Sequence, residues 1–250
     1  MLRQMMLASG MILAAGLTSA VSYAADKPSA EITAAVADAG RPAADKEKDA
    51  NRKPAETLAF AGVKSGQQVV DFLPGGGYFT RIFSKTVGPK GHVTALSPMG
   101  TPEKYTVAAK AIAADAAYSN VTAVSQKVAD LPAGSIDLFF TAQNYHDLHN
   151  LPNADVAAMD KSIFAALKPG GIFLVIDHAA PAGSGFQDTN TLHRIDEAAV
   201  KTEVESAGFK LVGSSDMLKN PNDPHTATVF DPSIKGKTDQ FVLKFEKPKS

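Results

Sequence analysis

Short, largely apolar runs alternate with amphipathic segments along most of the chain. The runs at 68–73, 136–140 and 172–176 carry apolar residues at successive positions, which is typical of strands buried on both faces. The segment 79–87 instead repeats its apolar residues at helical spacing and is followed by a Gly-Pro pair. Buried strands that alternate with amphipathic helices predict a mostly parallel sheet with helices on both faces. We therefore expect a single doubly wound α/β domain.

The same pattern predicts where the individual elements lie, and it contains no internal repeat. Strands are expected at residues 68–73, 92–96, 121–124, 136–140, 172–176, 209–212 and 241–245. Helices are expected at residues 54–60, 79–87, 101–117, 153–167 and 196–207. Asn153 is expected to cap the fourth of these helices, and the segment from Lys168 to Gly171 is expected to close it.

Residues 1–24 have the features of a secretory signal peptide. A positive charge comes first, an apolar stretch follows, and Ser22 and Ala24 place small residues at a cleavage site. The apolar stretch is short for a bilayer span, although an uncleaved membrane anchor is the alternative. We expect an exported protein, periplasmic if the source is a Gram-negative bacterium, without stable membrane insertion after cleavage. An N-terminal arm at 25–53 would precede the α/β domain at 54–250.

Composition and charge narrow the class of protein further. A chain of 250 residues, 44% of them apolar, is long enough to bury a full hydrophobic core. The absence of cysteine excludes a disulfide framework, thiolate catalysis and thiolate zinc sites. The formal net charge is −1, or −2 without the signal peptide, and the chain has five arginines. Such a balance argues against a nucleic-acid surface. The substrate is expected to be a small molecule. The oligomeric state stays open.

A glycine-rich turn follows the first predicted strand. Asp71 lies near the end of that strand, and the segment 74–77 then reads Pro-Gly-Gly-Gly before the next helix. Glycines let the backbone approach a ligand closely, and a helix N-terminus presents free N–H groups to negative charge. The dinucleotide fingerprint would need a third glycine where Thr80 stands, and no Gly-Lys-Ser/Thr follows for a phosphate loop. By itself, the turn equally fits a tight strand-to-helix connection.

The surroundings of this turn carry a resemblance to a known family. An acid closes the first strand, a Gly-x-Gly turn follows, and Tyr-Phe-Thr opens the helix, as in class I S-adenosylmethionine-dependent methyltransferases. The segments 87–93 and 167–171 resemble stretches before that family's second and fifth strands, and the resemblance covers about residues 50–245. The segments 144–147 and 192–195 (Asn-Tyr-His-Asp and Leu-His-Arg-Ile) resemble a group of predicted exported methyltransferases. The resemblance implies seven strands, the last antiparallel.

The resemblance also implies S-adenosylmethionine as the cofactor. Leu73 replaces the first glycine of the family's motif, and Ser97 stands where an acid would bind the ribose hydroxyls. These departures leave open a weak site, a different adenosyl ligand or a non-catalytic domain that only binds. The residues placed against the cofactor by the resemblance are Asp71, Gly75, Gly76, Gly77, Tyr78 and Ser97.

Polar residues after the fourth predicted strand are the candidates for catalysis. In this family the segment 143–149 would face the methyl group that is transferred, and the enzyme mainly aligns the acceptor with the sulfonium. His146 is the candidate base for a protonated acceptor, and Asp147 is a candidate to orient it. Asn144 completes the catalytic set. Each of these residues also fits a structural role, such as capping the next turn.

Histidines in the second half of the chain support an alternative of a different kind. The leading interpretation assigns no metal, but His146, His149 and His178 are the candidate ligands of a metal-dependent enzyme. The Gly- and Ser-rich segment 180–191 is a candidate lid over the same edge, or an ordinary solvent loop. Directly after it, His193-Arg194 fits either an anionic ligand or an ion pair with Asp196.

Overall fold

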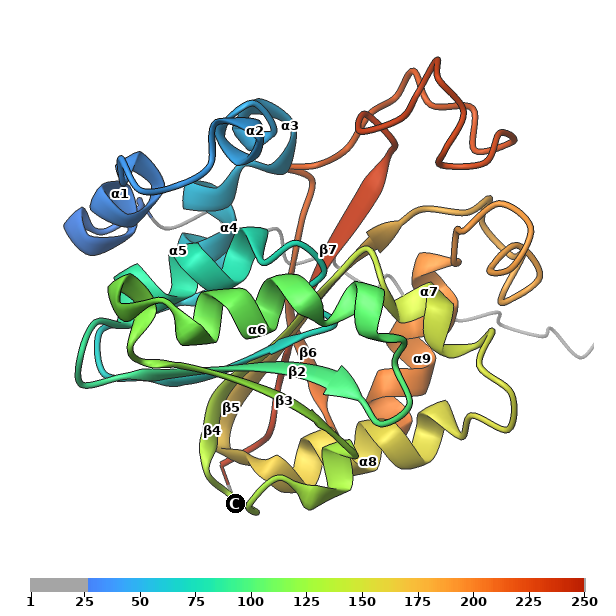
Figure 1. Cartoon of the computed structure of the whole chain (residues 1–250). Helices are drawn as coiled ribbons and strands as arrows, with labels where there is room; N and C mark the ends of the chain where they lie inside the picture. The colour runs from blue at the N-terminus through green and yellow to red at the C-terminus, as the bar shows by residue number, and fades with distance from the viewer. Residues whose placement is uncertain (1–26, 250) are drawn as a thin grey trace, which may run out of the picture.

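The computed structural model describes residues 27–249, so the predicted signal peptide at 1–24 lies outside the described residues. Figure 1 shows a twisted seven-stranded sheet through the middle of the molecule, with helices packed on both of its faces. The strands are β1 (Gln68–Phe72), β2 (His92–Pro98), β3 (Val121–Gln126), β4 (Ile136–Ala142), β5 (Leu167–His178), β6 (Lys210–Ser215) and β7 (Gln240–Glu246).

The helices of the described residues are mostly short. None of those between residues 27 and 249 combines the length and apolar character needed to cross a bilayer. They are α1 (Ala30–Ala37), α2 (Ala43–Lys46), α3 (Asp49–Arg52), α4 (Pro54–Ala61), α5 (Tyr78–Val87), α6 (Val107–Ala114), α7 (Tyr145–Leu148), α8 (Val156–Ala166) and α9 (Glu197–Ser206).

The strands lie in the order β3-β2-β1-β4-β5-β7-β6. β1 pairs in parallel with β2 and β4, and the pairs β2–β3 and β4–β5 are also parallel. β7 runs antiparallel to both β5 and β6. This arrangement confirms the predicted doubly wound, mostly parallel sheet with an antiparallel last strand. The strand order reverses between β1 and β4, and sheets of this kind bind ligands at the carboxyl ends of such strands.

Successive side chains of each central strand serve two separate hydrophobic cores. Val69 of β1 belongs to the core that α1, α4, α5 and α6 cover, whereas Val70 belongs to the core under α7, α8 and α9. Phe139 and Phe140 of β4 divide between the two cores in the same way. Because strand side chains point to opposite faces in alternation, a strand covered on both faces must be apolar throughout. This is the physical origin of the uninterrupted apolar runs.

The segment before α4 packs on the domain. Helix α1 contacts α4 and α5, and its Ile32 and Ala35 are buried in the first core. After α1, the Arg41 guanidinium donates to both carboxylate oxygens of Asp49, at 2.9 and 2.6 Å. A bidentate pair of this kind fixes the direction of both partners. It therefore holds the start of α3 against the segment that follows α1.

Local hydrogen bonds explain two of the predicted element boundaries that were wrong. The helix expected at 101–117 is divided into α6 and two 3-10 turns at 103–105 and 116–118. The second turn forms because the Asp115 carboxylate accepts from the Ala117 N–H, which competes with continuation of the helix. The cap of α8 is Asp155, which accepts from the Ala158 N–H, and not Asn153.

The segment from Lys168 to Gly171 extends β5 and does not close a helix. Leu167, the first residue of β5, already pairs with Ile136 of β4. The Lys247 ammonium donates to the carbonyls of Phe164 and Leu167 at 2.8 and 2.7 Å, so a distant lysine satisfies carbonyls at the end of α8. Because this partner lies directly after the last strand, far along the chain, local sequence could not indicate it.

Two neighbouring glycines of the β1–α5 turn give a prediction about stability. A Cβ at Gly77 would lie 2.1 Å from Cδ1 of Ile112 on α6, and its φ of +75° is strained for any other residue. A Cβ at Gly76 would meet no atom within 4 Å. We expect Gly77→Ala to lower the free energy of unfolding by about 1–3 kcal/mol and Gly76→Ala to change it by less than about 0.5 kcal/mol. Urea unfolding measures both, and equal losses would contradict the packing role of Gly77.

Candidate functional site

The first half of the site is the glycine turn at the carboxyl end of β1. Gly75 and Gly76 are exposed, and a Cβ added to either would meet no atom within 4 Å. Gly77 is buried against Ile112. The three glycines of the turn therefore have two different roles. The backbone of Gly75 and Gly76 faces open space, whereas Gly77 allows α6 to pack closely.

Leu73 keeps the backbone conformation that a glycine would favour at its position. Its φ is +55°, in the left-handed region, and its N–H donates to the Leu96 carbonyl at 2.8 Å. A left-handed residue other than glycine costs about 1–2 kcal/mol, which the surrounding turn must offset. The replacement of the motif's first glycine therefore leaves the course of the chain intact.

Asp71 lies directly beneath the turn and is buried. Thr80 of α5 donates its hydroxyl to Asp71 Oδ2 at 2.5 Å. Burial raises the pKa of Asp71 to about 7, although the Thr80 hydrogen bond and the Arg52 charge act in the opposite direction. A carboxyl group in this position ties the end of β1 to the first turn of α5 and carries charge sensitive to near-neutral pH.

The Tyr78 side chain contacts residues of α3. Its side chain is buried and its hydroxyl donates to Asp49 Oδ1 at 2.6 Å. The Arg52 guanidinium lies 4.6 Å from the centre of the Tyr78 ring and 5.2 Å from that of Phe79. These cation–π contacts and the hydrogen bond give Tyr78 a structural function. They anchor α3 to the turn, and they leave the tyrosine hydroxyl already paired.

Ser97 lies near the end of β2, next to the glycine turn. It is buried, and its backbone pairs in register with Ser125 of β3. The acid that follows in the sequence, Glu103, is 81% exposed in its side chain and lies 3.9 Å from the Lys110 ammonium. The carboxylate expected for ribose hydroxyls is therefore replaced by a short hydroxyl group.

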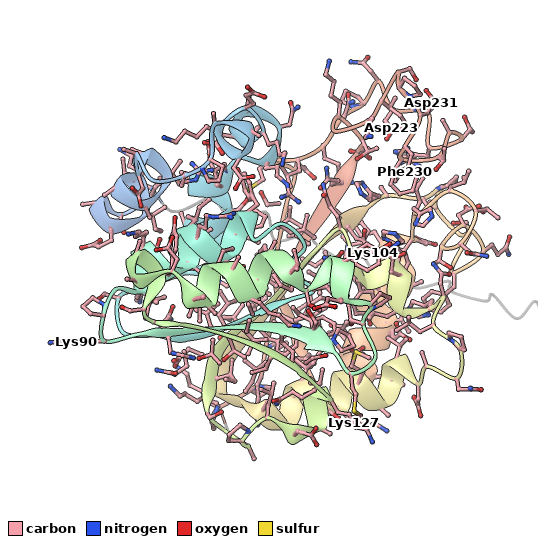
Figure 2. The ribbon with its side chains drawn as sticks, viewed as in Figure 1. Lys90, Lys104, Lys127, Asp223, Phe230 and Asp231 are labelled. Carbon is pink, nitrogen blue, oxygen red and sulfur yellow. The ribbon has the colours of Figure 1, made fainter. Side chains whose placement is uncertain are left out.

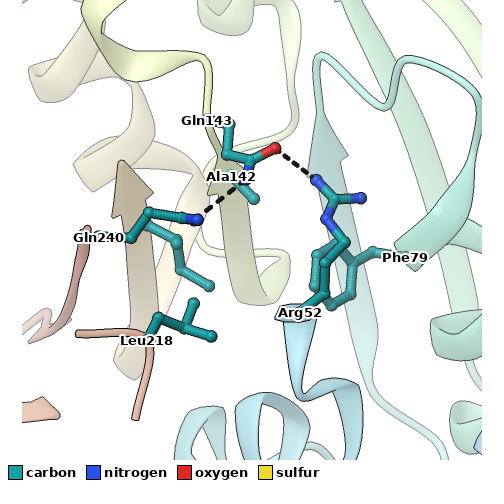
Figure 3. Close-up of a pocket in the computed structure, with 7 residues that line it drawn as sticks. Arg52, Phe79, Ala142, Gln143, Leu218 and Gln240 are labelled. Atoms are coloured by element: carbon teal, nitrogen blue, oxygen red, sulfur yellow. Dashed lines mark hydrogen bonds between the residues drawn. The ribbon is translucent and has the colours of Figure 1, made fainter. Parts of the chain in front are cut away.

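A chain of three polar side chains crosses from α3 to β7 over the ends of the strands (Figure 3). Arg52 donates to Gln143 Oε1 at 2.8 Å, and Gln143 Nε2 donates to Gln240 Oε1 at 3.1 Å. The cavity beside them has a volume of about 10 Å³, far below the ~300 Å³ at which ligand pockets begin. Burial lowers the pKa of Arg52 from its ordinary value. The chain of bonds thus closes this part of the strand edge.

Asn144, after β4, connects two strand ends. Its side-chain amide donates to the carbonyls of Leu73 and Ala142, at 3.1 and 2.7 Å. Both amide hydrogens are thereby used. The residue therefore holds the β4 end against the glycine turn, which is a positioning role.

The second half of the site begins with His146 and Asp177. The buried Asp177 carboxylate, in β5, lies 2.8 Å from His146 Nδ1. It also accepts the backbone N–H groups of His146 and His178, at 2.7 and 2.8 Å. Burial is the largest single influence and would lower the pKa of His146, but the charge and hydrogen bond of Asp177, together with the Asp147 charge, outweigh it, so the pKa is raised. The acid that orients His146 is therefore Asp177, which sequence reasoning did not assign to the site.

Asp147 and His193 lie on the other side of the His146 ring. Asp147 Oδ1 is 3.3 Å from His146 Nε2, and His193 Nδ1 is 3.4 Å from the same carboxylate oxygen. His146 Nε2 and His193 Nδ1 are 3.3 Å apart. Three residues that could ligate a metal thus meet here, and they are not the three histidines grouped from sequence.

His149 and His178 have other partners. His149 Nε2 lies 3.0 Å from Glu203 Oε2, and its ring stacks on Phe186. His178 Nδ1 is 2.7 Å from the Thr238 hydroxyl, and burial lowers the pKa of His178 to about 4. The candidate cluster of His146, His149 and His178 is therefore wrong as a shared ligand set.

Arg194 also has a different partner from either proposed in the sequence analysis. It is fully buried and lies 2.9 Å from the Asp223 carboxylate, in the long segment between β6 and β7 (Figure 2). It donates as well to the carbonyls of Ala179 and Ala227, each at 3.0 Å. Asp196 instead caps α9 through the Ala198 N–H. This clamp fixes the segment after β5.

Two residues of the site, Arg52 and Asp177, were not assigned from the sequence, and His193 was considered there only as a contact for an anionic ligand. Asp177 ends the most apolar strand of the chain, and an acid in that position is a usable signal. Arg52 and His193 approach their partners across 91 and 47 residues of chain, respectively. Such separations leave no local pattern.

The strand order and the open glycine turn define the class I S-adenosylmethionine-dependent methyltransferase fold. Residues 49–195 match the model of the ubiE/COQ5 methyltransferase family. The chain therefore belongs to this family. Membership of this family supports S-adenosylmethionine as the cofactor. The resemblance to exported members stays a prediction.

Curated relatives agree with the family assignment. The chain is 31% identical over 128 residues to the ubiquinone/menaquinone biosynthesis C-methyltransferase UbiE of Pseudomonas paraeruginosa, covering 51% of this chain and 48% of that protein. The UbiE protein of Vibrio vulnificus is 31% identical over 125 residues, with 50% and 46% covered. The chain therefore spans about half the length of the curated relatives it matches.

Two solved structures illustrate the shared fold. An S-adenosylmethionine-dependent methyltransferase from Aquifex aeolicus superposes with a TM-score of 0.59 at 19% identity, covering 82% of this chain and 98% of that one. The [4+2]-cyclase SpnF superposes with a TM-score of 0.61 at 16% identity, covering 85% of each chain. At these identities the likeness concerns the fold alone.

The buried carboxyl of Asp71 predicts a pH-dependent stability. The pKa of Asp71 in the folded protein, about 7, lies above its ordinary value. The contribution of this group to the free energy of unfolding is therefore present in acid and is lost as the pH rises through about 7. Asp71→Asn cannot ionise. We expect the melting temperature of the wild type, relative to this variant, to fall by about 3–8 °C between pH 5 and pH 8. Thermal melting of ligand-free protein measures this, and parallel pH profiles would contradict the assignment.

Proposed function

We propose that the protein transfers a methyl group from S-adenosylmethionine to a small-molecule acceptor. The observation that carries the proposal is the exposed backbone of Gly75 and Gly76, which faces open space at the strand-order switch of a chain in this family. When bound, S-adenosylmethionine supplies a methyl group activated by its sulfonium sulfur. The role of the protein is to hold this methyl group and to align an acceptor with it.

The residues around the turn fit such a ligand in part. Gly75 and Gly76 offer main chain without side-chain obstruction, and the N-terminus of α5 follows. We propose that these groups hold the methionine end of the cofactor and that Ser97 approaches its ribose. Asp71 supports the turn from below, through Thr80. Because a hydroxyl offers fewer hydrogen bonds than a carboxylate, the ribose end of this site is expected to bind weakly.

The polar residues after β4 form the acceptor end of the proposed site. Asn144 holds the β4 end to the glycine turn, which fixes the two halves relative to each other. We propose that His146 and Asp147 face the acceptor and bind its polar group. The earlier hypothesis that His146 acts as a general base stays a prediction.

The acceptor is proposed as a small molecule on the basis of the relatives. Those relatives carry names that describe C-methyltransferases of ubiquinone and menaquinone biosynthesis. The matched region is about half of their length, so we extend only the reaction class to this chain. The near-neutral charge of the chain agrees with an acceptor that is neither nucleic acid nor another polyanion.

We also propose that the protein is exported, because residues 1–24 have the pattern of a signal peptide. Expression of the full chain in a Gram-negative host is expected to give periplasmic protein that begins at Ala25. An arginine introduced at Leu13, inside the apolar stretch, should leave the protein uncleaved in the cytoplasm. Equal processing of both forms, or an intact wild-type N-terminus, would contradict export by this route.

Cofactor binding is tested with two glycines that differ only in location. Gly75 and Gly134 both have positive φ values, +53° and +61°, and a Cβ at either meets no atom within 4 Å. Alanine should therefore cost the same stability at both positions, about 1–2 kcal/mol. By calorimetric titration with S-adenosylmethionine, we expect Gly75→Ala to bind at least about tenfold more weakly, whereas Gly134→Ala binds like the wild type.

Two results of this experiment would overturn the proposed function. A wild-type protein that binds neither S-adenosylmethionine nor its demethylated product would leave a methyltransferase-like domain with another role. A Gly75→Ala variant of unchanged affinity would mean that the ligand does not lie against the turn. Transfer of a labelled methyl group to a small-molecule extract, weakened in Gly75→Ala but not in Gly134→Ala, completes the test for catalysis.

A further inference from the structure

Three potential ligand atoms, two from α7 and one from the loop before α9, form a nearly equilateral triangle. His146 Nε2 lies 3.3 Å from His193 Nδ1 and 3.3 Å from Asp147 Oδ1, and the remaining side, from His193 Nδ1 to Asp147 Oδ1, measures 3.4 Å. Within residues 27–249, these three residues form the group of histidines and carboxylates compact enough to share one metal ion.

The size of the triangle fits tetrahedral coordination. Zn²⁺ binds histidine nitrogen and carboxylate oxygen at about 2.0–2.1 Å, and a tetrahedral angle then separates two ligand atoms by about 3.3–3.4 Å. An octahedral ion with bonds of about 2.1 Å would place adjacent ligands about 3.0 Å apart. All three sides of the triangle agree with the tetrahedral value.

A buried acid supports the first ligand from behind. Asp177 Oδ1 lies 2.8 Å from His146 Nδ1, the ring nitrogen opposite to the one that belongs to the triangle. Histidines that bind metals commonly donate their other N–H to a carboxylate, which fixes the tautomer and directs the free lone pair. Asp177 is fully buried, and two backbone N–H groups hold it in place. The His146 ring is therefore oriented before any ligand arrives.

The fold also fixes the position of His193. Its neighbour Arg194 is fully buried and clamped to Asp223, so His193 projects from an anchored point. The Phe230 ring contacts the His193 ring edge to face, at 4.8 Å between centres (Figure 2 labels Phe230 in the segment between β6 and β7). An aromatic ring against one face of a ligand limits its rotation and shields it from water.

We propose that His146, Asp147 and His193 bind one Zn²⁺ ion, with a fourth coordination position left for water or a substrate atom. Three protein ligands and one exchangeable position are typical of catalytic zinc sites. The side chain of His146 is buried, whereas those of Asp147 and His193 are 45% and 30% exposed, so the ion is accessible from solvent on that side. A bound oxygen, nitrogen or sulfur of a small molecule can take the fourth position.

The inference revises the sequence-based assignment and goes beyond the proposed methyl transfer. The leading sequence interpretation assigned no metal, and the alternative used His149 and His178, which lie beside Glu203 and Thr238 instead. The zinc site retains His146 and adds Asp147 and His193. Zinc binding requires neither S-adenosylmethionine nor turnover, so the two proposals can fail separately.

A competition titration tests the site. Tag-free protein that lacks residues 1–24 is titrated with Zn²⁺ against a chromophoric chelator, in the absence of S-adenosylmethionine. We expect one equivalent to bind, and Co²⁺ in its place should give the strong visible absorption of a tetrahedral ion. His193→Ala and Asp147→Ala each remove a ligand and should weaken Zn²⁺ binding by more than about 100-fold, whereas Asp177→Asn should weaken it by about 10–100-fold.

Two histidines serve as matched controls, because each has a carboxylate partner outside the triangle. His149 lies beside Glu203 and His225 beside Asp239, so His149→Gln and His225→Gln should keep the wild-type affinity. Thermal melting establishes that every variant is folded. Binding that survives both ligand substitutions, or that falls as far in His149→Gln, would overturn the site. Failure of the wild type to bind Zn²⁺ or Co²⁺ would reduce the cluster to a hydrogen-bonded histidine pair.

Discussion

The carboxylate of Asp177 is fully buried, and a buried charge is stable only when other groups pair with it. It is paired with the His146 ring and accepts hydrogen bonds from two backbone N–H groups. The His146 charge and these hydrogen bonds lower the pKa of Asp177, although burial acts to raise it. The turn after β4 is thereby bound to the end of β5. The contacts of His146 with Asp147 and His193 depend on that connection, because it sets the direction in which the His146 ring faces.

The fold could be predicted from the sequence because burial on both faces leaves a strong pattern. Strands such as β4 and β5 must be apolar at successive positions, and the helices between them must be amphipathic. Boundaries were less accurate where a single side chain decides them: Asp115 starts a 3-10 turn, and Asp155 displaces Asn153 as a cap. The site was predicted only in part. His146 and Asp147 follow a strand end, but His193 reaches them through a clamp that involves a separate segment of the chain.

The glycine turn shows that one motif can combine different physical requirements. Gly75 and Gly76 leave space above the backbone, whereas Gly77 gives space to Ile112 of a packed helix. Leu73 keeps the left-handed backbone without being a glycine. Position 73 therefore has the backbone conformation that a glycine would favour, although the residue type departs from the family pattern. Ser97 is a different kind of departure, since it alters the hydrogen-bonding groups that a ligand would meet and leaves the backbone unchanged.

The Arg194–Asp223 clamp makes the loop before α9 and the long segment between β6 and β7 one mechanical unit. This segment lies at the antiparallel edge of the sheet, where insertions disturb neither the parallel core nor the glycine turn. Its sequence can therefore diverge while the cofactor half of the molecule stays the same. Through Arg194 and Phe230, any such change reaches His193. Exchange of the segment between β6 and β7, in evolution or by design, could therefore alter the surroundings of His193 without changes to the glycine turn.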